Sequence, residues 1–131
     1  GRILDRIIRA WFAFDTTDPP MAFSWFNTSK VYAFIDAEVA AVVKRVPPAR
    51  LGDNAATAAR ATEQLAKWHD QTLRRAQEFV QREKPNLYQK ARIANRMKWA
   101  LLEAKYPKSF VDPFAYALAT VVAGANAQRE I

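Results

Sequence analysis

The chain has 131 residues, half of them hydrophobic, and its 20 lysines and arginines outnumber its 13 aspartates and glutamates, which gives a net charge of +7. This apolar content excludes an intrinsically disordered chain, and the length is that of a single domain. With no cysteine, one histidine and three glycines, the chain lacks the residues for a disulfide framework, a thiolate zinc site, a cysteine nucleophile or a glycine-rich phosphate loop.

The first 14 residues have the pattern of an amphipathic helix, with apolar side chains at helical spacing and three arginines on the other side. This helix should end before Pro19 and Pro20, since the residue preceding a proline disfavours the helical conformation. We divide the chain into residues 1–20, an amphipathic N-terminal helix or arm, and residues 21–131, a single helical domain. If Met21 is an internal start, the arm is a leader or an upstream remnant; the alternative is that it is a native part of the protein. Residues 1–14 also suit an anionic membrane surface, so peripheral membrane contact is one hypothesis for them.

The next predicted helix begins at a cap on Thr28 or Ser29 and runs to about Val46. Its apolar side chains occupy most of its circumference, which indicates burial on nearly all sides. Pro47 and Pro48 are expected to end it.

The longest predicted helix spans Asn54 to Lys84 and contains no helix breaker. Its apolar residues recur at helical spacing and form one stripe that should face the core. The predicted buried face consists of Ala58, Ala61, Leu65, Trp68, Thr72, Ala76 and Phe79, widened by Leu73 and Val80.

Pro85 closes this helix, and Asn86 followed by Gln89 resembles a capping box that opens another helix. The new helix should run to about Tyr106, where Pro107 ends it. Because the connection at Pro85 is short, the two helices are expected to fold back as an αα-hairpin.

The last predicted helix begins with Asp112 as its cap and Pro113 in its first turn, runs to Ala123 and ends at Gly124. The longest nearly apolar run, Phe114 to Ala125, is well short of the roughly 20 residues that cross a bilayer, so no transmembrane span is predicted.

No stretch alternates with the two-residue period of a strand, and no internal repeat is present. The sequence therefore predicts an all-α fold, a bundle of about five helices built on the central αα-hairpin, with the apolar second and last helices filling its seam.

The charge is unevenly distributed along the chain. Residues 49–110 contain 13 lysines and arginines against six aspartates and glutamates, so this basic hairpin carries the whole surplus of seven. On its first helix, acidic residues precede basic residues by four positions, which predicts ion pairs on a solvated face. The expected pairs are Glu63 with Lys67, Asp70 with Arg74, and Glu78 with Arg82.

The second helix of the hairpin carries the candidate binding site. At about 100° per residue, its aliphatic side chains gather on one side, while Tyr88, Arg92, Arg96, Trp99 and Tyr106 gather on the other. Arginine and large aromatic residues dominate binding hot spots, so this stripe is predicted to bind a partner. The alternatives are that Arg92 and Arg96 lie over Trp99 within the chain, or that the N-terminal segment buries the stripe.

The sequence offers few candidates for catalytic residues. His69 lies at the edge of the apolar stripe of its helix, next to Asp70 in sequence. Because successive helical residues point about 100° apart, we expect Asp70 to lie on another face and not to orient the imidazole. The close carboxylate pairs outside the hairpin do not have the arrangement of a catalytic acid and base. We therefore predict no enzymatic activity, no catalytic residue, no metal and no cofactor.

Two helices that are apolar nearly all round exceed what a lone small monomer covers. We therefore predict a non-enzymatic helical interaction or assembly subunit, which docks on a protein partner or forms a homo-oligomer through its apolar helices and its arginine and aromatic face. The alternative is a nucleic-acid-binding module that uses the basic hairpin of residues 49–110. We expect an intracellular rather than a secreted protein, because Arg9 interrupts the apolar stretch that a secretory signal needs.

Overall fold

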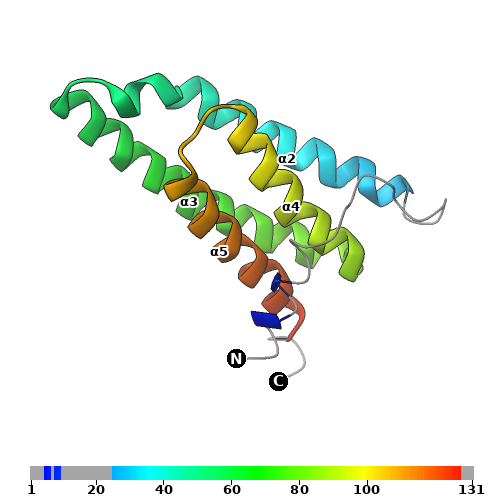
Figure 1. The fold of residues 1–131 in the computed structure, drawn as a ribbon. Coiled ribbons are helices and arrows are strands. Elements are labelled where there is room, and N and C mark those ends of the chain that lie inside the picture. The colour runs from blue at the N-terminus through cyan, green and yellow to red at the C-terminus, as the bar shows by residue number, and fades with distance from the viewer. Residues whose placement is uncertain (1–4, 7, 10–24, 128–131) are drawn as a thin grey trace.

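The computed structural model describes residues 5, 6, 8 and 9 and residues 25–127 (Figure 1). All regular secondary structure in this part of the chain is helical, and no strand occurs there. The elements are α2 (Trp25–Arg45), a short 3-10 helix η2 (Pro48–Gly52), α3 (Ala55–Glu83), α4 (Leu87–Glu103) and α5 (Lys108–Ala127). The predicted all-α bundle is confirmed. Four long helices lie in the described residues against about five predicted, because most of the first predicted helix falls outside them.

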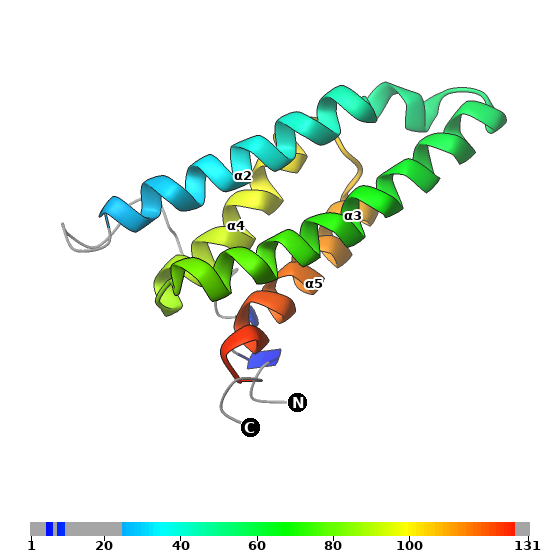
Figure 2. The same ribbon diagram turned by 180° about the vertical axis from the view of Figure 1, so that it is seen from behind.

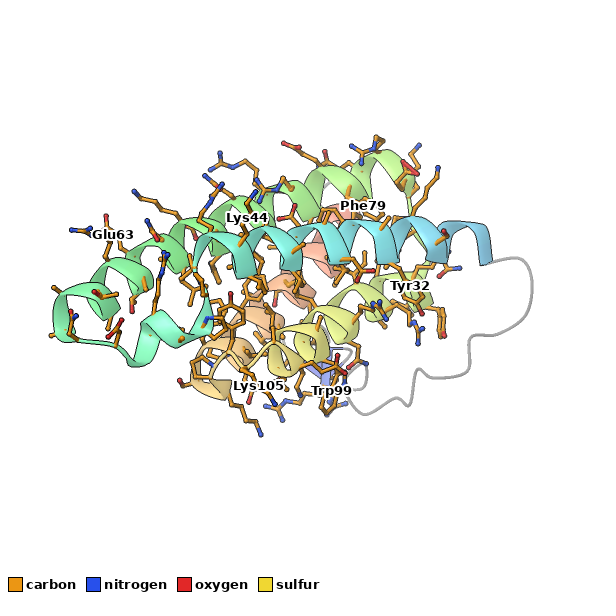
Figure 3. The ribbon with its side chains drawn as sticks, turned by 90° about the horizontal axis from the view of Figure 1, so that it is seen from above. Tyr32, Lys44, Glu63, Phe79, Trp99 and Lys105 are labelled. Carbon is orange, nitrogen blue, oxygen red and sulfur yellow. The ribbon has the colours of Figure 1, made fainter. Side chains whose placement is uncertain are left out.

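The apolar helices α2 and α5 lie between α3 and α4. Each of them packs against both α3 and α4, and Figure 3 shows α2 running between these two helices when the molecule is seen from above. One continuous core receives buried side chains from all four helices, and Trp68 and Phe114 are the largest of them. The two apolar helices therefore fill the seam of the α3–α4 hairpin, as the sequence predicts.

α2 begins earlier than predicted. The helix already includes Trp25, so a cap at Thr28 or Ser29 is wrong. Its C-terminal end at Arg45 agrees with the prediction, because the two prolines that follow cannot continue the helix.

α3 has the predicted length. The side-chain oxygen of Asn54 accepts a hydrogen bond from the Thr57 N–H at 3.0 Å and caps the first turn. At the other end Lys84 adopts a left-handed conformation with φ 49°, and its N–H bonds to the Val80 carbonyl. Within the predicted buried face, Ala61, Leu65, Trp68, Thr72, Ala76, Phe79 and Val80 are buried, and Ala58 and Leu73 are partly buried.

The predicted capping box of α4 is confirmed. The side-chain oxygen of Asn86 accepts from the Gln89 N–H at 2.8 Å, and that of Gln89 accepts from the Asn86 N–H at 2.9 Å. The two reciprocal bonds satisfy donors that the first turn of a helix leaves open.

The C-terminal end of α4 differs from the prediction. The helix stops at Glu103 because Lys105 takes a left-handed conformation with φ 80°. The N–H of Lys105 bonds to the Leu102 carbonyl at 3.0 Å, and the N–H of Tyr106 bonds to the Leu101 carbonyl at 3.1 Å. This is the Schellman arrangement, in which the chain turns back over the last helical turn. It carries Tyr106 off the helix and into the core.

α5 begins four residues before the predicted cap at Asp112. The carbonyl of Pro107 accepts from the N–H groups of Phe110 and Val111, both at 3.0 Å, so the first turn forms before Pro113 is reached. Pro113 consequently lies inside the helix, and the predicted end at Gly124 is also wrong, because α5 continues to Ala127. None of the helices in the described residues is long and apolar enough to cross a membrane.

The described residues of the N-terminal segment pack on the bundle. Ile8 is buried in a small cluster with alanines of α4 and α5, and Asp5 accepts a hydrogen bond from the Tyr116 hydroxyl. Figure 1 and Figure 2 both place these residues beside the C-terminal part of α5. The other residues of the predicted 1–20 arm lie outside the described part of the chain.

Glu38 forms a buried polar link between α2 and α3. Its carboxylate accepts two hydrogen bonds from Arg75, at 2.8 and 2.7 Å, and one from the Thr72 hydroxyl at 2.7 Å. Its backbone carbonyl accepts from the Trp68 indole N–H at 3.1 Å. The carboxylate raises the pKa of Arg75, chiefly through these hydrogen bonds. A buried carboxylate is tolerated here because it is fully hydrogen-bonded.

Candidate protein-binding surface

Four of the five predicted binding residues lie on one side of α4. Tyr88, Arg92, Arg96 and Trp99 follow one another at helical spacing, and two residues of α2, Tyr32 and Asp36, face them. We call these six residues the α2–α4 surface. Figure 3 shows Tyr32 between the two helices and Trp99 at the outer edge of α4.

Tyr106 does not belong to this surface. It is only 3% exposed, and its hydroxyl donates a hydrogen bond to the Val46 carbonyl at 2.7 Å. The sequence pattern continued α4 through this residue, whereas the left-handed turn at Lys105 redirects its side chain into the core. Tyr106 is therefore a core residue, and its place in the predicted stripe was wrong.

Tyr32 supplies the aromatic face for both arginines. The guanidinium carbons of Arg92 and Arg96 lie 5.1 and 4.4 Å from the centre of its ring, within the range of a cation–π contact. Arg92 also lies 5.9 Å from the ring of Tyr88. The sequence allows a cation–π contact of these arginines with Trp99. The arginines do form an intramolecular cation–π contact, but with Tyr32 in place of Trp99.

The two arginines differ in their surroundings. Arg96 forms an exposed ion pair with Asp36, with nitrogen–oxygen distances of 3.2 and 3.4 Å. The Nε atom of Arg92 is buried and has no hydrogen-bond partner among the residues that the structure describes. Burial, and to a smaller extent the neighbouring charge of Arg96, lowers the pKa of Arg92. Arg92 is thus held within the fold, while Arg96 is available at the surface.

Trp99 is the exposed aromatic residue of the surface. Its side chain and backbone together are 57% exposed, and the ammonium of Lys98 lies 5.5 Å from the centre of its ring. Among the described residues, the large apolar side chains of Leu87, Val43 and Tyr116 are also exposed, but none of them lines the pocket that Trp99 shares with Arg92 and Arg96.

A groove of about 640 Å³ runs along this surface. Two cationic residues, Arg92 and Arg96, and two acidic residues, Asp36 and Glu103, line it together with the indole of Trp99. The groove is therefore balanced in charge, although the hairpin as a whole is basic. The sequence pattern did not predict that Asp36 of α2 would line this groove. The four-residue spacing of Tyr32 and Asp36 puts them on one face of α2, but it does not say which helix they meet.

The expectation about His69 is wrong in one respect. Its Nδ1 atom lies 3.1 Å from a carboxylate oxygen of Asp70, and its ring packs at 4.9 Å from that of Phe114. The side chains bend toward each other although their backbone positions diverge. Among the described residues no hydroxyl hydrogen-bonds to His69, and no group of three or more histidine or acidic side chains is placed to hold a metal ion.

Only one of the three ion pairs predicted for α3 forms. Glu63 lies 3.9 Å from Lys67, but Asp70 contacts His69 rather than Arg74. Arg82 pairs with Glu83 rather than Glu78, and Glu83 also pairs with the ammonium of Lys30 from α2. Contacts between adjacent residues of α3 thus replace two of the four-residue pairs, which are individually weak.

Comparison with known proteins finds no family model, no curated protein and no solved structure that matches the chain.

Proposed function

We propose that the protein is a non-enzymatic helical interaction subunit that docks on a protein partner through the α2–α4 surface. The observation that carries this proposal is the exposure of Trp99 next to the surface guanidinium of Arg96. Tryptophan and arginine are enriched at the centres of protein interfaces, where tryptophan buries a large apolar area and arginine adds several hydrogen-bond donors. An exposed indole on the wall of a groove is therefore suited to contact a second protein.

The charge pattern of the groove supports a protein partner. A nucleic acid presents phosphates, which a groove lined equally by acids and cations does not favour. A protein surface carries both signs, and its carboxylates and amines can pair with Arg96 and Glu103 at the rim of an interface. The α2–α4 surface therefore fits the protein hypothesis better than the nucleic-acid one.

The test compares two exposed apolar residues of the same helix. Leu87 is 61% exposed and lies near the start of α4, away from the groove, so Leu87→Ala is the matched control for Trp99→Ala. The protein is isolated under native conditions from its source cells, and the mass and stoichiometry of its complex are measured. We expect a complex that Trp99→Ala dissociates and Leu87→Ala retains. A complex that survives Trp99→Ala, or a wild-type protein with no bound partner, would contradict the proposal.

Nucleic-acid binding by the hairpin of residues 49–110 is the second candidate. It is supported by Arg60 and Arg74, which are exposed on α3 and form no ion pair with a described residue. These two cations lie on α3, apart from the α2–α4 surface, so substitutions on the two helices separate the two functions.

A further inference from the structure

We infer that the partner of the α2–α4 surface is a second copy of this chain, with α4 packing antiparallel on α4 around a two-fold axis between Trp99 and Ala100. This inference rests on the proposed function, because it names the partner of the same surface.

A two-fold interface requires a surface that is complementary to itself. If one residue contacts a second residue on the other copy, that second residue contacts the first in return. A surface of one charge would therefore repel its own copy. The groove meets this requirement, since Arg92 and Arg96 are matched by Asp36 and Glu103. A partner of opposite charge would instead require a surface of one sign.

The spacing along α4 defines the register. Arg96 lies three residues before Trp99, and Glu103 lies three residues after Ala100. In an antiparallel pair centred between Trp99 and Ala100, Arg96 of each copy therefore faces Glu103 of the other. Because seven residues make two helical turns, Arg96 and Glu103 also lie on one side of the helix. Two ion pairs related by the symmetry axis result.

Glu103 is free to make this contact. It is exposed, it lines the groove, and it forms no ion pair with a residue that the structure describes. Arg96 is held by the ring of Tyr32 and by an ion pair with Asp36, and this ion pair is exposed to solvent. Exchanging or sharing an exposed ion pair costs little free energy, since such pairs contribute at most about 1 kcal/mol.

The same register gives the indole a place to pack. Trp99 of one copy faces Ala100 of the other, and Ala104 also lines the groove one turn further on. A large side chain opposite small ones lets two helices approach closely and interdigitate. The exposed area of Trp99 is thus removed from water in the dimer. This burial of apolar surface is the main contribution to the stability of the dimer.

The experiment measures the mass of the 131-residue chain by sedimentation equilibrium across the micromolar concentration range. The wild-type protein is expected to reach twice its 14.9 kDa monomer mass. Arg96→Glu and Glu103→Arg should each weaken dimerisation at least roughly tenfold, because each puts like charges together at both symmetric contacts. An equimolar mixture of the two variants should dimerise again, since every contact in the mixed dimer joins opposite charges.

Two substitutions on α3 control for the change in net charge. Arg74→Glu and Glu78→Arg alter the same charges at exposed positions away from the groove, and they should leave the dimer mass unchanged. Circular dichroism checks that each variant keeps its helical content. A monomeric wild-type protein, single variants that still dimerise, or a mixture that stays monomeric would each overturn the inference. A monomeric chain that nevertheless forms a Trp99-dependent complex with another protein would overturn the dimer and leave the proposed function standing.

Discussion

The hydroxyl of Tyr106, just after α4, donates a hydrogen bond at 2.7 Å to the carbonyl of Val46, just after α2. This bond ties the ends of two helices together inside the core, where the carbonyl has no access to water. Tyr106→Phe removes the donor and leaves the Val46 carbonyl unsatisfied, so we expect a loss of about 1–2 kcal/mol in the free energy of unfolding. Urea denaturation of both proteins measures the difference. Equal stabilities would show that this bond contributes nothing.

Burial also makes Tyr106 a source of alkaline sensitivity, because it raises the pKa of the hydroxyl from its ordinary 10 to about 12. In the unfolded chain the Tyr106 hydroxyl ionises above pH 10, whereas in the folded protein it stays protonated up to about pH 12. The contribution of the protonated Tyr106 hydroxyl to stability is therefore fully present below pH 10 and is lost as the pH rises from 10 through 12. In that window the free energy of unfolding falls by up to about 1.4 kcal/mol per pH unit. Tyr106→Phe should show a smaller decline in stability between pH 10 and 12 than the wild type. Because the hydrogen bond to Asp5 also raises the pKa of Tyr116, the prediction concerns the difference between the two proteins.

The turn that places Tyr106 depends on an unfavourable conformation of Lys105. Its φ of 80° is disfavoured for a residue with a Cβ atom, whereas glycine adopts it readily. Lys105→Gly should therefore raise the melting temperature, with a gain of about 0.5–1 kcal/mol after the greater flexibility of glycine in the unfolded chain is taken into account. Ala100→Gly, in the C-terminal half of α4, should lower the stability by a similar amount, since glycine inside a helix is destabilising.

Local signals explain which parts of the fold were predictable. The side chains of Asn54, Asn86 and Gln89 bond to backbone groups three residues away, so the starts of α3 and α4 follow from the sequence. The left-handed turn at Lys105 has no such signal, because the residue that forms it is not glycine. Its effect on Tyr106 therefore could not be anticipated.

The candidate site was predictable to the extent that it belongs to one helix. The spacing of Arg92, Arg96 and Trp99 along α4 is a property of the helix itself and was sufficient to place them together. Tyr32 and Asp36 come from α2, and only the packing of α2 on α4 brings them to the arginines. A single sequence contains the period of each helix but not the angle at which two helices cross.

The buried network at Glu38 should contribute more to stability than the exposed pair at Asp36, two residues away on the same helix. Glu38→Gln weakens the bonds to Arg75 and Thr72 in a buried place, and we expect a loss of about 1–3 kcal/mol, the lower values reflecting the partial exposure of Arg75. Asp36→Asn breaks a solvent-exposed ion pair and should cost less than about 1 kcal/mol. Thermal denaturation of the two variants tests the order. The reverse order would mean that the exposed pair, and not Glu38, holds α2 in place.

Nucleic-acid binding makes a quantitative prediction of its own, because each phosphate contact releases counterions. If the exposed cations of α3 bind a duplex, the logarithm of the affinity should fall steeply with the logarithm of the salt concentration, and removing Arg60 or Arg74 should reduce the slope by about 1 each. We expect instead no measurable binding to duplex DNA at about 50 mM salt, where such contacts are strong. Fluorescence anisotropy of a labelled duplex decides between these results, and salt-sensitive binding that requires both arginines would favour the nucleic-acid function.

Two tryptophans of the protein should behave in opposite ways when they are replaced. Trp68 is 1% exposed and packs against Phe114 in the centre of the core, so Trp68→Ala should lower the free energy of unfolding by about 3–5 kcal/mol. Trp99 is exposed and contributes little to the core, so Trp99→Ala should change the stability of the monomer by less than about 0.5 kcal/mol. Denaturation at a concentration low enough to keep the chain monomeric makes the comparison. A large loss of stability in Trp99→Ala would mean that this indole serves the fold, and the protein would then have no exposed anchor on the α2–α4 surface for a partner to bury.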